Sequence, residues 1–233
     1  MGFDRALLIG NSRWHWVERH GATLKFEHGA PDPARLGSDP PVWAAVGSVP
    51  DQLLSHEQRR IRLHDVPLPR CPPWLGVDRA IGAWQAWKAS CARHLDLRHG
   101  LVLADAGTVL SLTNLSSQGV FTGGLLVPGY RLQLQAMAQG TQALPELTGW
   151  PVGDAVFPMQ TDGAMRRGVM LALTAVVQEV QRIRAAPIWI CGGDGPQLAE
   201  ALRERGLTVY LNENLQLEGL AALAADIKRD PDR

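Results

Sequence analysis

The N-terminal part of the chain alternates short apolar runs with turns rich in glycine, asparagine and proline. Short apolar runs bounded by turn residues are typical of strands. The first three runs are joined by tight turns, which predicts a strand meander. The expected elements are strands over 6–9, 14–17, 23–27 and 42–46, a polar helical segment over 51–60 and a short strand over 61–66.

Longer amphipathic segments follow a proline-dense loop at Leu68–Trp74. Apolar residues at helical spacing predict a helix that starts near Asp78, and a second series of strands begins at Leu101. The segment 161–184 has apolar positions on more than one face, which suits a core or a subunit interface; Thr161 is its expected N-cap and Gly168 a close-packing point. The remaining predictions are helices over 130–139, 196–205 and 215–228 and strands over 187–191 and 207–211.

The order of these elements indicates a duplication. Each half of the chain opens with a strand meander and places a glycine turn between its first two strands, at Gly10 and at Gly107. We therefore expect an α/β protein with an N-terminal domain over residues 1–99 and a C-terminal domain over 100–233. Two such hairpins facing each other across an interdomain cleft are typical of the actin-like and acetate and sugar kinase superfamily, whose duplicated domains are ribonuclease-H-like.

Composition narrows the class of protein. Of 233 residues 45% are hydrophobic and 20% charged, as in an ordinary globular protein, and the formal net charge of zero disfavours a nucleic-acid or acidic-lipid partner. The three cysteines lack C-x-x-C pairing, which argues against a disulfide framework or a zinc site. Because no apolar run resembles a signal peptide or a membrane span, we expect a cytoplasmic protein.

The stretch from Leu101 to Gly129 offers chemistry for a cation and a phosphate. An apolar strand ends in Asp105, Gly107 and Thr108, and a second apolar run ends in Pro128-Gly129. Carboxylate and hydroxyl oxygens are hard ligands, and glycine lets main-chain N–H groups approach an anion closely. The pattern predicts a phosphate-handling site.

Three other motifs have both a chemical and a structural interpretation. The turn Gly10–Arg13 presents N–H groups, an amide, a hydroxyl and a guanidinium that suit a phosphate, or it is a plain hairpin turn. Asp78 and Arg79 at a helix start provide a general base and an anchor for a carboxylate, or Asp78 is only an N-cap. The glycine turn Gly192–Gly195 between a strand and a helix favours an anion, or it only connects the two elements.

Taken together, these motifs resemble type III pantothenate kinases, in particular the shorter, tryptophan-rich cyanobacterial type. The matching pieces occur in the family's order and span most of the chain: IGNSR at 9–13, LGVDR at 75–79, LADAGT at 103–108, GGLLVPG at 123–129, P-x-x-T-x-x-A-x-x-x-G at 158–168 and CGGDG at 191–195. The resemblance implies ATP-dependent phosphorylation of the primary hydroxyl of pantothenate by a homodimer whose sites lie at the subunit interface. It also implies Mg²⁺ with ATP and a monovalent cation, K⁺ or NH₄⁺.

The resemblance implies roles for individual residues. Asp78 is the proton acceptor for the hydroxyl, Arg79 suits the substrate carboxylate, Asp105 is the monovalent-cation ligand, and Thr161 contacts pantothenate from the partner subunit. The implied pantothenate site comprises Gly76, Val77, Asp78, Arg79 and Thr161, and the implied ATP contacts are Leu8, Ile9, Gly10, Asn11, Ser12, Arg13, Trp14, His15 and Thr108.

The chain departs from the family pattern at the first motif. Leu8 stands where the family usually has an aspartate that serves the metal–phosphate assembly, and Ser12 replaces a threonine. The loop before Asp78 lacks the tyrosine that often contacts the substrate, and Trp74 is the nearest aromatic residue. Two alternatives therefore accompany the kinase hypothesis: a regulatory or accessory relative that binds ligands without turnover, and an actin-like ATPase that acts through partners.

Overall fold

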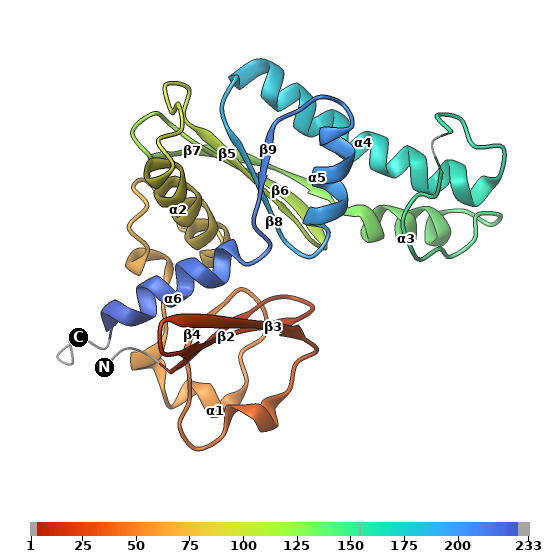
Figure 1. Ribbon diagram of the computed structural model, residues 1–233. Helices are drawn as coiled ribbons and strands as arrows, with labels where there is room; N and C mark the ends of the chain where they lie inside the picture. Colours follow the sequence, from red (N-terminus) through yellow and green to blue (C-terminus); the bar gives the residue numbers. More distant parts are fainter. Residues whose placement is uncertain (1–3, 154, 228–233) are drawn as a thin grey trace. The chain divides into compact units, whose positions relative to one another are not determined.

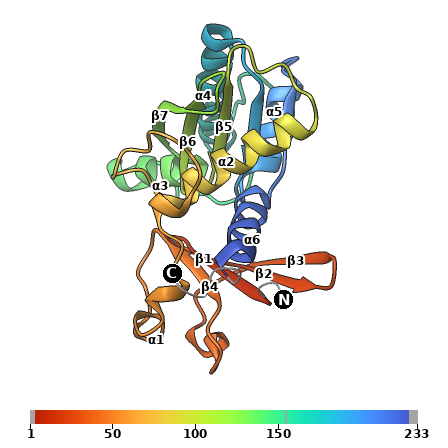
Figure 2. The same cartoon turned by 90° about the vertical axis from the view of Figure 1, so that its left-hand side faces the viewer.

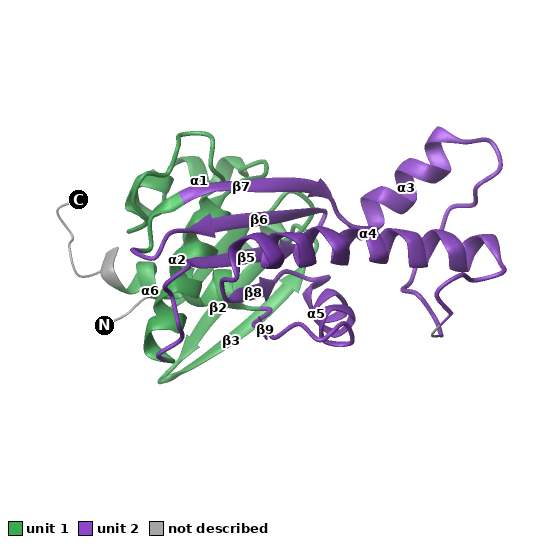
Figure 3. Ribbon diagram, turned by 90° about the horizontal axis from the view of Figure 1, so that it is seen from above, with its two compact units in different colours: residues 1–93, 119–121, 214–233 green, residues 94–118, 122–213 purple. Residues whose placement is uncertain are grey.

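The computed structural model describes residues 4–153 and 155–227, which belong to two compact units (Figures 1 and 3). Unit 1 comprises residues 1–93, 119–121 and 214–233, and unit 2 comprises residues 94–118 and 122–213. The last helix thus belongs to the same unit as the N-terminal sheet. The division into domains 1–99 and 100–233, a statement about segments of the chain that fold independently, stays a prediction.

Unit 1 is built on a four-stranded sheet with the strand order β3-β2-β1-β4. Its strands are β1 (Arg5–Ile9), β2 (Trp14–His20), β3 (Thr23–Gly29) and β4 (Val42–Ala45). The first three are antiparallel, as the tight turns predicted, and β4 runs parallel to β1. Since side chains alternate between the faces of a strand, the tryptophans of β2 share one face. They form a buried cluster there with Leu7, Ile9, Leu36, Trp43 and Leu53.

The two long helices of unit 1, α2 (Val77–Ala92) and α6 (Leu215–Ile227), pack against each other, and α6 contacts β1 and β2 (Figure 2). A Cβ at Gly219 would lie 2.7 Å from Cγ2 of Ile81, so a glycine is needed where the two helices meet. The sequence predicted α6 to reach Lys228, which lies outside the described residues.

The segment between β4 and α2 differs from its prediction. The expected helix over 51–60 is only α1 (Asp51–Leu54) followed by a short 3-10 turn, Glu57–Arg59. The strand expected over 61–66 is wrong: one bridge joins Trp43 to Arg60, and the chain then forms a 3-10 turn, Leu63–Asp65. The carboxylate of Asp65 accepts a hydrogen bond from the backbone N–H of Arg62 at 2.8 Å, which favours the turn over an extended strand.

Unit 2 contains a five-stranded sheet with the order β7-β6-β5-β8-β9. Its core includes residues of β5, β6 and β8 and of all three helices, so the helices bury one face of this sheet. The elements are β5 (Leu101–Ala106), β6 (Val109–Leu115), β7 (Phe121–Pro128), α3 (Tyr130–Gly140), α4 (Thr161–Arg184), β8 (Ile188–Cys191), α5 (Gly195–Arg203) and β9 (Val209–Leu211).

The two sheets repeat one plan. Each consists of antiparallel strands from a meander followed by a parallel strand beside the first: β3-β2-β1-β4 in unit 1 and β7-β6-β5-β8 in unit 2. In unit 2 the parallel strand β9 extends the plan, whereas in unit 1 a single bridge between Trp43 and Arg60 follows β4 among the described residues. The duplication predicted from the order of elements is therefore present.

The long helix α4 has the predicted limits, Thr161–Arg184, but two details differ. Gln160 is the N-cap residue, so the prediction for Thr161 is wrong, and a Cβ at Gly168 would meet nothing within 4 Å, so Gly168 is not a close-packing point within the described chain. Across residues 4–153 and 155–227, none of the helices, α4 included, combines the length and the apolar character required to span a bilayer.

Candidate functional site

The turn between β1 and β2 is exposed, whereas the strand residues on either side of it are buried. The N–H of Gly10 donates to the carbonyl of Arg13 at 3.0 Å, which closes the hairpin. Asn11, Ser12 and Arg13 are exposed, so their polar groups face solvent. The flanking side chains of Leu8, Ile9 and Trp14 are buried, which leaves only their main chain available to a ligand.

His15 lies beside this turn and is half-buried. Its Nε2 lies 3.4 Å from the position of a Cβ at Gly10, and its Nδ1 lies 2.8 Å from Nδ1 of His28. His28 in turn places its Nε2 2.9 Å from Oδ1 of Asn214. Burial, together with the nearby His28 and Arg13, lowers the pKa of His15 to about 4, so its imidazole is neutral at pH 7.

The residues that follow β4 contact both the β1–β2 turn and the start of α2. The N–H groups of Val46 and Gly47 both donate to the carbonyl of Ile9, at 2.9 and 3.2 Å. A Cβ at Gly47 would lie 2.2 Å from the carbonyl oxygen of Gly10, and a Cβ at Gly76 would lie 3.4 Å from Val46. Unit 1 therefore brings two of the predicted motifs to one end of its sheet. Gly47 was not among the residues predicted from the sequence, although a glycine directly after a buried strand was a usable signal.

Asp78 and Arg79 occupy the first turn of α2. Gly76 is the N-cap residue and Asp78 is not, so the interpretation of Asp78 as an N-cap is excluded. Its Oδ1 accepts a hydrogen bond from the backbone N–H of Arg79 at 2.7 Å. Burial raises the pKa of the Asp78 carboxyl, while that hydrogen bond and the charge of Arg79 act in the opposite direction. A carboxylate with a raised pKa is a better proton acceptor than an exposed aspartate.

In unit 2 the third motif packs against the glycine turn that follows β8. Asp105 of β5 pairs with Cys191 of β8, and Gly192 next to it has φ 87°. A Cβ at Gly192 would lie 2.4 Å from the carbonyl oxygen of Ala106 and 2.5 Å from Oδ1 of Asp105. The N–H of Asp194 donates to that same carbonyl at 2.9 Å. Only a glycine fits between these groups.

Gly129 completes this cluster from the end of β7. Its N–H donates to the carbonyl of Thr108 at 2.9 Å, and a Cβ on it would lie 2.1 Å from the carbonyl oxygen of Gly107. Three segments that are distant in sequence, around Asp105, Gly129 and Gly192, thus meet at one end of the sheet of unit 2, where β5, β7 and β8 end. Thr108 is exposed at this end.

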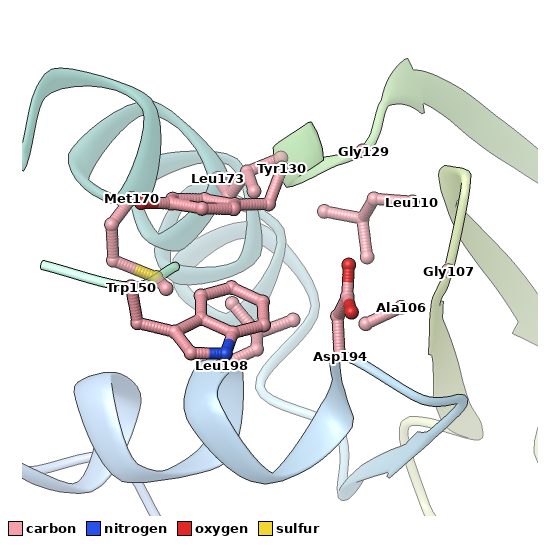
Figure 4. Close-up of a pocket in the computed structure, with 10 residues that line it drawn as sticks. All are labelled: Ala106, Gly107, Leu110, Gly129, Tyr130, Trp150, Met170, Leu173, Asp194 and Leu198. Atoms are coloured by element: carbon pink, nitrogen blue, oxygen red, sulfur yellow. The ribbon is translucent and has the colours of Figure 1, made fainter. Parts of the chain in front are cut away.

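A small pocket opens beside the same turn, between the strands and helices α3, α4 and α5 (Figure 4). The rings of Tyr130 and Trp150 lie 4.4 Å apart on one side, and the carboxylate of Asp194, bonded to Arg131 at 3.0 Å, lies on the other. Burial raises the pKa of Tyr130 to about 12. The glycines of the pocket and Asp194 belong to motifs that the sequence singled out, whereas Tyr130 and Trp150 were not predicted to take part. It is lined by Ala106, Gly107, Leu110, Gly129, Tyr130, Trp150, Met170, Leu173, Asp194 and Leu198.

Two other predicted residues lie apart from these clusters within their own units. Thr161 is exposed at the first position of α4, in the part of the helix that projects with α3 beyond the sheet of unit 2 (Figure 3). Trp74 is 67% exposed and packs edge-on against Phe121. Within residues 4–153 and 155–227, no group of three or more acidic, histidine or cysteine side chains surrounds a metal position. A cation at Asp105 would therefore need further oxygen ligands from the main chain, water or a bound molecule.

Solved structures share the fold of the chain. A protein from Campylobacter jejuni described as a Baf family transcriptional activator superposes with a TM-score of 0.67 at 20% identity, covering 98% of this chain and all 100% of that one. The activator of 2-hydroxyisocaproyl-CoA dehydratase from Clostridium difficile, with bound ADPNP, gives 0.53 at 14% identity and covers 98% and 97% of the two chains. The predicted fold class, a duplicated ribonuclease-H-like α/β fold, is confirmed.

Sequence comparisons identify the family. The type III pantothenate kinase family model matches residues 60–183. The type III pantothenate kinase of Synechococcus elongatus is 34% identical over 253 aligned residues, covering 97% of this chain and 98% of that protein. The one from Synechococcus sp. strain JA-3-3Ab is 31% identical and covers 93% of this chain and 90% of that protein. With two units of one plan and these matches over most of its length, the chain belongs to the type III pantothenate kinase family.

Proposed function

We propose that this protein is a pantothenate kinase that transfers the terminal phosphoryl group of ATP to the primary hydroxyl of pantothenate. The product is 4′-phosphopantothenate, and the reaction is the first step of coenzyme A biosynthesis. Family membership over nearly the whole chain supports the activity. The observation that carries it is Asp78: a half-buried carboxyl with a raised pKa in the first turn of α2, next to Arg79.

Asp78 is the proton acceptor in this proposal. Phosphoryl transfer depends on positioning and charge stabilisation, and the acceptor hydroxyl must lose its proton as the bond to phosphorus forms. The raised pKa of Asp78 makes its carboxylate a stronger base, so it accepts the proton of the hydroxyl more readily. Arg79 binds the carboxylate of pantothenate, while the main chain of Gly76 and Val77 lines the substrate site.

The two glycine turns receive the nucleotide. In the β1–β2 turn the ATP contacts come from the main chain of Leu8 to Trp14 and from the exposed side chains of Asn11, Ser12 and Arg13, because the other side chains of that segment are buried. In unit 2 Thr108 contacts ATP from an exposed position. Mg²⁺ bound with ATP neutralises charge on the phosphates.

Asp105 is the ligand of a monovalent cation, K⁺ or NH₄⁺. Its Oδ1 lies next to the glycine position 192, where the carbonyl oxygen of Ala106 is also close. A carboxylate beside a carbonyl oxygen suits a hard cation. The donor set at this position therefore fits the cation that the family resemblance implies.

A homodimer is the proposed assembly, with Thr161 contacting the pantothenate bound to the partner subunit. The loop before α4 exposes large apolar side chains: Val152 is 94%, Phe157 88% and Met159 95% exposed. Monomers rarely leave such groups together in water, and Thr161 directly follows this segment.

The cytoplasmic location expected from the sequence stays a prediction.

Leu8 favours the regulatory alternative, but neither the described residues nor the family comparisons add support for it. The decisive experiment is a coupled ADP-release assay with pantothenate, ATP, Mg²⁺ and K⁺, on the wild type, Asp78→Asn and the control Asp51→Asn, an exposed aspartate in the first turn of α1. We expect Asp78→Asn to lower kcat by about 10²- to 10⁴-fold, the usual contribution of a general base. The control should retain wild-type turnover.

This assay tests the kinase activity and the role of Asp78 separately. A wild type that releases no ADP in response to pantothenate would refute the kinase assignment. Unchanged turnover in Asp78→Asn would remove Asp78 as the base but leave the activity in place.

Shared sites are tested by mixing two inactive variants, Asp78→Asn and Thr161→Ala. A mixed dimer contains one site with both native residues, so random exchange of subunits should restore about a quarter of the wild-type activity. An active species that sedimentation shows to be monomeric, or a mixture that stays inactive although its subunits exchange, would contradict the shared site.

A further inference from the structure

His15 belongs to a row of residues that crosses the sheet of unit 1. It lies opposite Leu8 on one neighbouring strand and opposite His28 on the other, and Leu8 pairs in turn with Ala44. Directly paired residues place their side chains on the same face, with Cβ atoms about 5 Å apart. His15 is thus the lateral neighbour of Leu8, an apolar residue that offers no ligand to a cation.

The hydrogen bonds of this row fix which nitrogen of His15 carries the proton. Oδ1 of Asn214 can only accept, so the Nε2 of His28 that lies 2.9 Å away donates to it. With its proton on Nε2, His28 has an unprotonated Nδ1, which accepts from Nδ1–H of His15 at 2.8 Å. The Nε2 of His15 is left unprotonated, as an acceptor.

That acceptor is directed at the nucleotide turn. It lies 3.4 Å from the Cβ position of Gly10, and no described residue forms a hydrogen bond with it. Burial of the ring, the row partner His28 on β3 and the charge of Arg13 in the turn keep the imidazole neutral. Phosphate oxygens only accept hydrogen bonds at neutral pH, so a bare nitrogen cannot bond to them. The donors that accompany a nucleotide's phosphates are the water molecules on its divalent cation.

We propose that Nε2 of His15 accepts a hydrogen bond from a water molecule of the Mg²⁺ ion that binds with the nucleotide. His28 and Asn214 are positioning residues that hold His15 in the tautomer this contact needs. This role supplies a metal-facing group next to Leu8, and it rests on the nucleotide site proposed for the β1–β2 turn. A neutral nitrogen suits a water-mediated contact, because Mg²⁺ keeps several waters and prefers oxygen as a direct ligand.

The first test is the tautomer in the protein without nucleotide, read from ¹⁵N chemical shifts of the imidazole rings. We expect His15 protonated at Nδ1 and bare at Nε2. Asn214→Asp keeps the acceptor and should retain this state, whereas Asn214→Leu should produce a mixture of tautomers. A His15 ring protonated at Nε2 in the wild type would overturn the proposal.

The second test separates the cation from the nucleotide by calorimetric titration with ADP, with and without Mg²⁺. In the wild type and in His15→Gln, which keeps an acceptor near the same place, Mg²⁺ should strengthen ADP binding. In His15→Leu we expect about a tenfold loss of that gain, the size of one lost hydrogen bond to a water on a cation, with binding of metal-free ADP unchanged. Adding Mg²⁺ to the ADP complex should also shift the ¹⁵Nε2 resonance of His15.

The outcomes distinguish this role from the proposed function. An equal gain from Mg²⁺ in the wild type and His15→Leu, with ADP bound in both, would refute the role of His15 and leave the kinase assignment intact. A wild type that binds no ADP under either condition would refute the nucleotide site itself and this inference with it. A uniform loss of ADP affinity in His15→Leu, independent of Mg²⁺, would show contact with the nucleotide rather than with the cation.

Discussion

Acid should destabilise this protein through His15. The folded protein lowers the pKa of His15 from 6.5 to about 4, mainly through burial, so the unfolded chain binds more protons between these two values. Stability from this group is therefore complete above pH 6.5 and is lost as the pH falls toward 4. The full difference amounts to about 3 kcal/mol at 1.36 kcal/mol per pKa unit, and about 2 kcal/mol of it is lost between pH 7.5 and pH 5.

The assay is urea unfolding at pH 7.5, 6.5, 5.5 and 5.0, followed by tryptophan fluorescence, for the wild type, His15→Gln and the control His64→Gln. The control removes a histidine whose side chain is 73% exposed. We expect the free-energy difference between the wild type and His15→Gln to shrink by about 2 kcal/mol toward pH 5, because glutamine does not titrate. A difference that stays constant across this range would refute the argument, and so would an equal pH dependence in the two histidine variants.

Two substitutions, the first with a matched control, test the packing around the site of unit 2. Gly192→Ala places a methyl group against the carbonyl of Ala106 at a residue with φ 87°, so it should lower the free energy of unfolding in urea by about 1–3 kcal/mol or more. The control Gly193→Ala, where a Cβ meets nothing within 4 Å, should lower it by less than about 1 kcal/mol. Equal losses in the two variants would contradict the close approach at Gly192. Tyr130→Phe removes a buried hydroxyl without a hydrogen-bond partner, so thermal unfolding should show no loss of stability, and a loss above about 1 kcal/mol would reveal an essential bond there.

Local patterns were sufficient for most of the secondary structure. The limits of α4 follow from its sequence, and the three strands of the N-terminal meander follow from apolar runs joined by glycine turns. These elements depend on spacing within one segment, so the sequence of that segment contains the information. The strand expected over 61–66 failed because a side-chain hydrogen bond, from the Arg62 N–H to Asp65, stabilises a turn in place of an extended chain.

The sequence predicted part of the candidate site. Gly129 and Gly192, two glycines that tolerate no side chain, lie in motifs that the sequence already singled out. Gly47, which packs the end of β4 against Gly10, was not predicted, and neither was the aromatic side of the pocket formed by Tyr130 and Trp150. Both depend on contacts between segments far apart in the chain, which no local pattern encodes.

The sequence by itself determined the family, the duplicated plan and the chemical groups available, because these reside in motifs and in the order of elements. Only the tertiary structure placed α6 with the N-terminal unit, where Asn214 reaches His28 and His28 reaches His15. The physical reason is strand register: it decides that His15 is the neighbour of both Leu8 and His28, and a shift by one residue would turn its ring to the other face of the sheet.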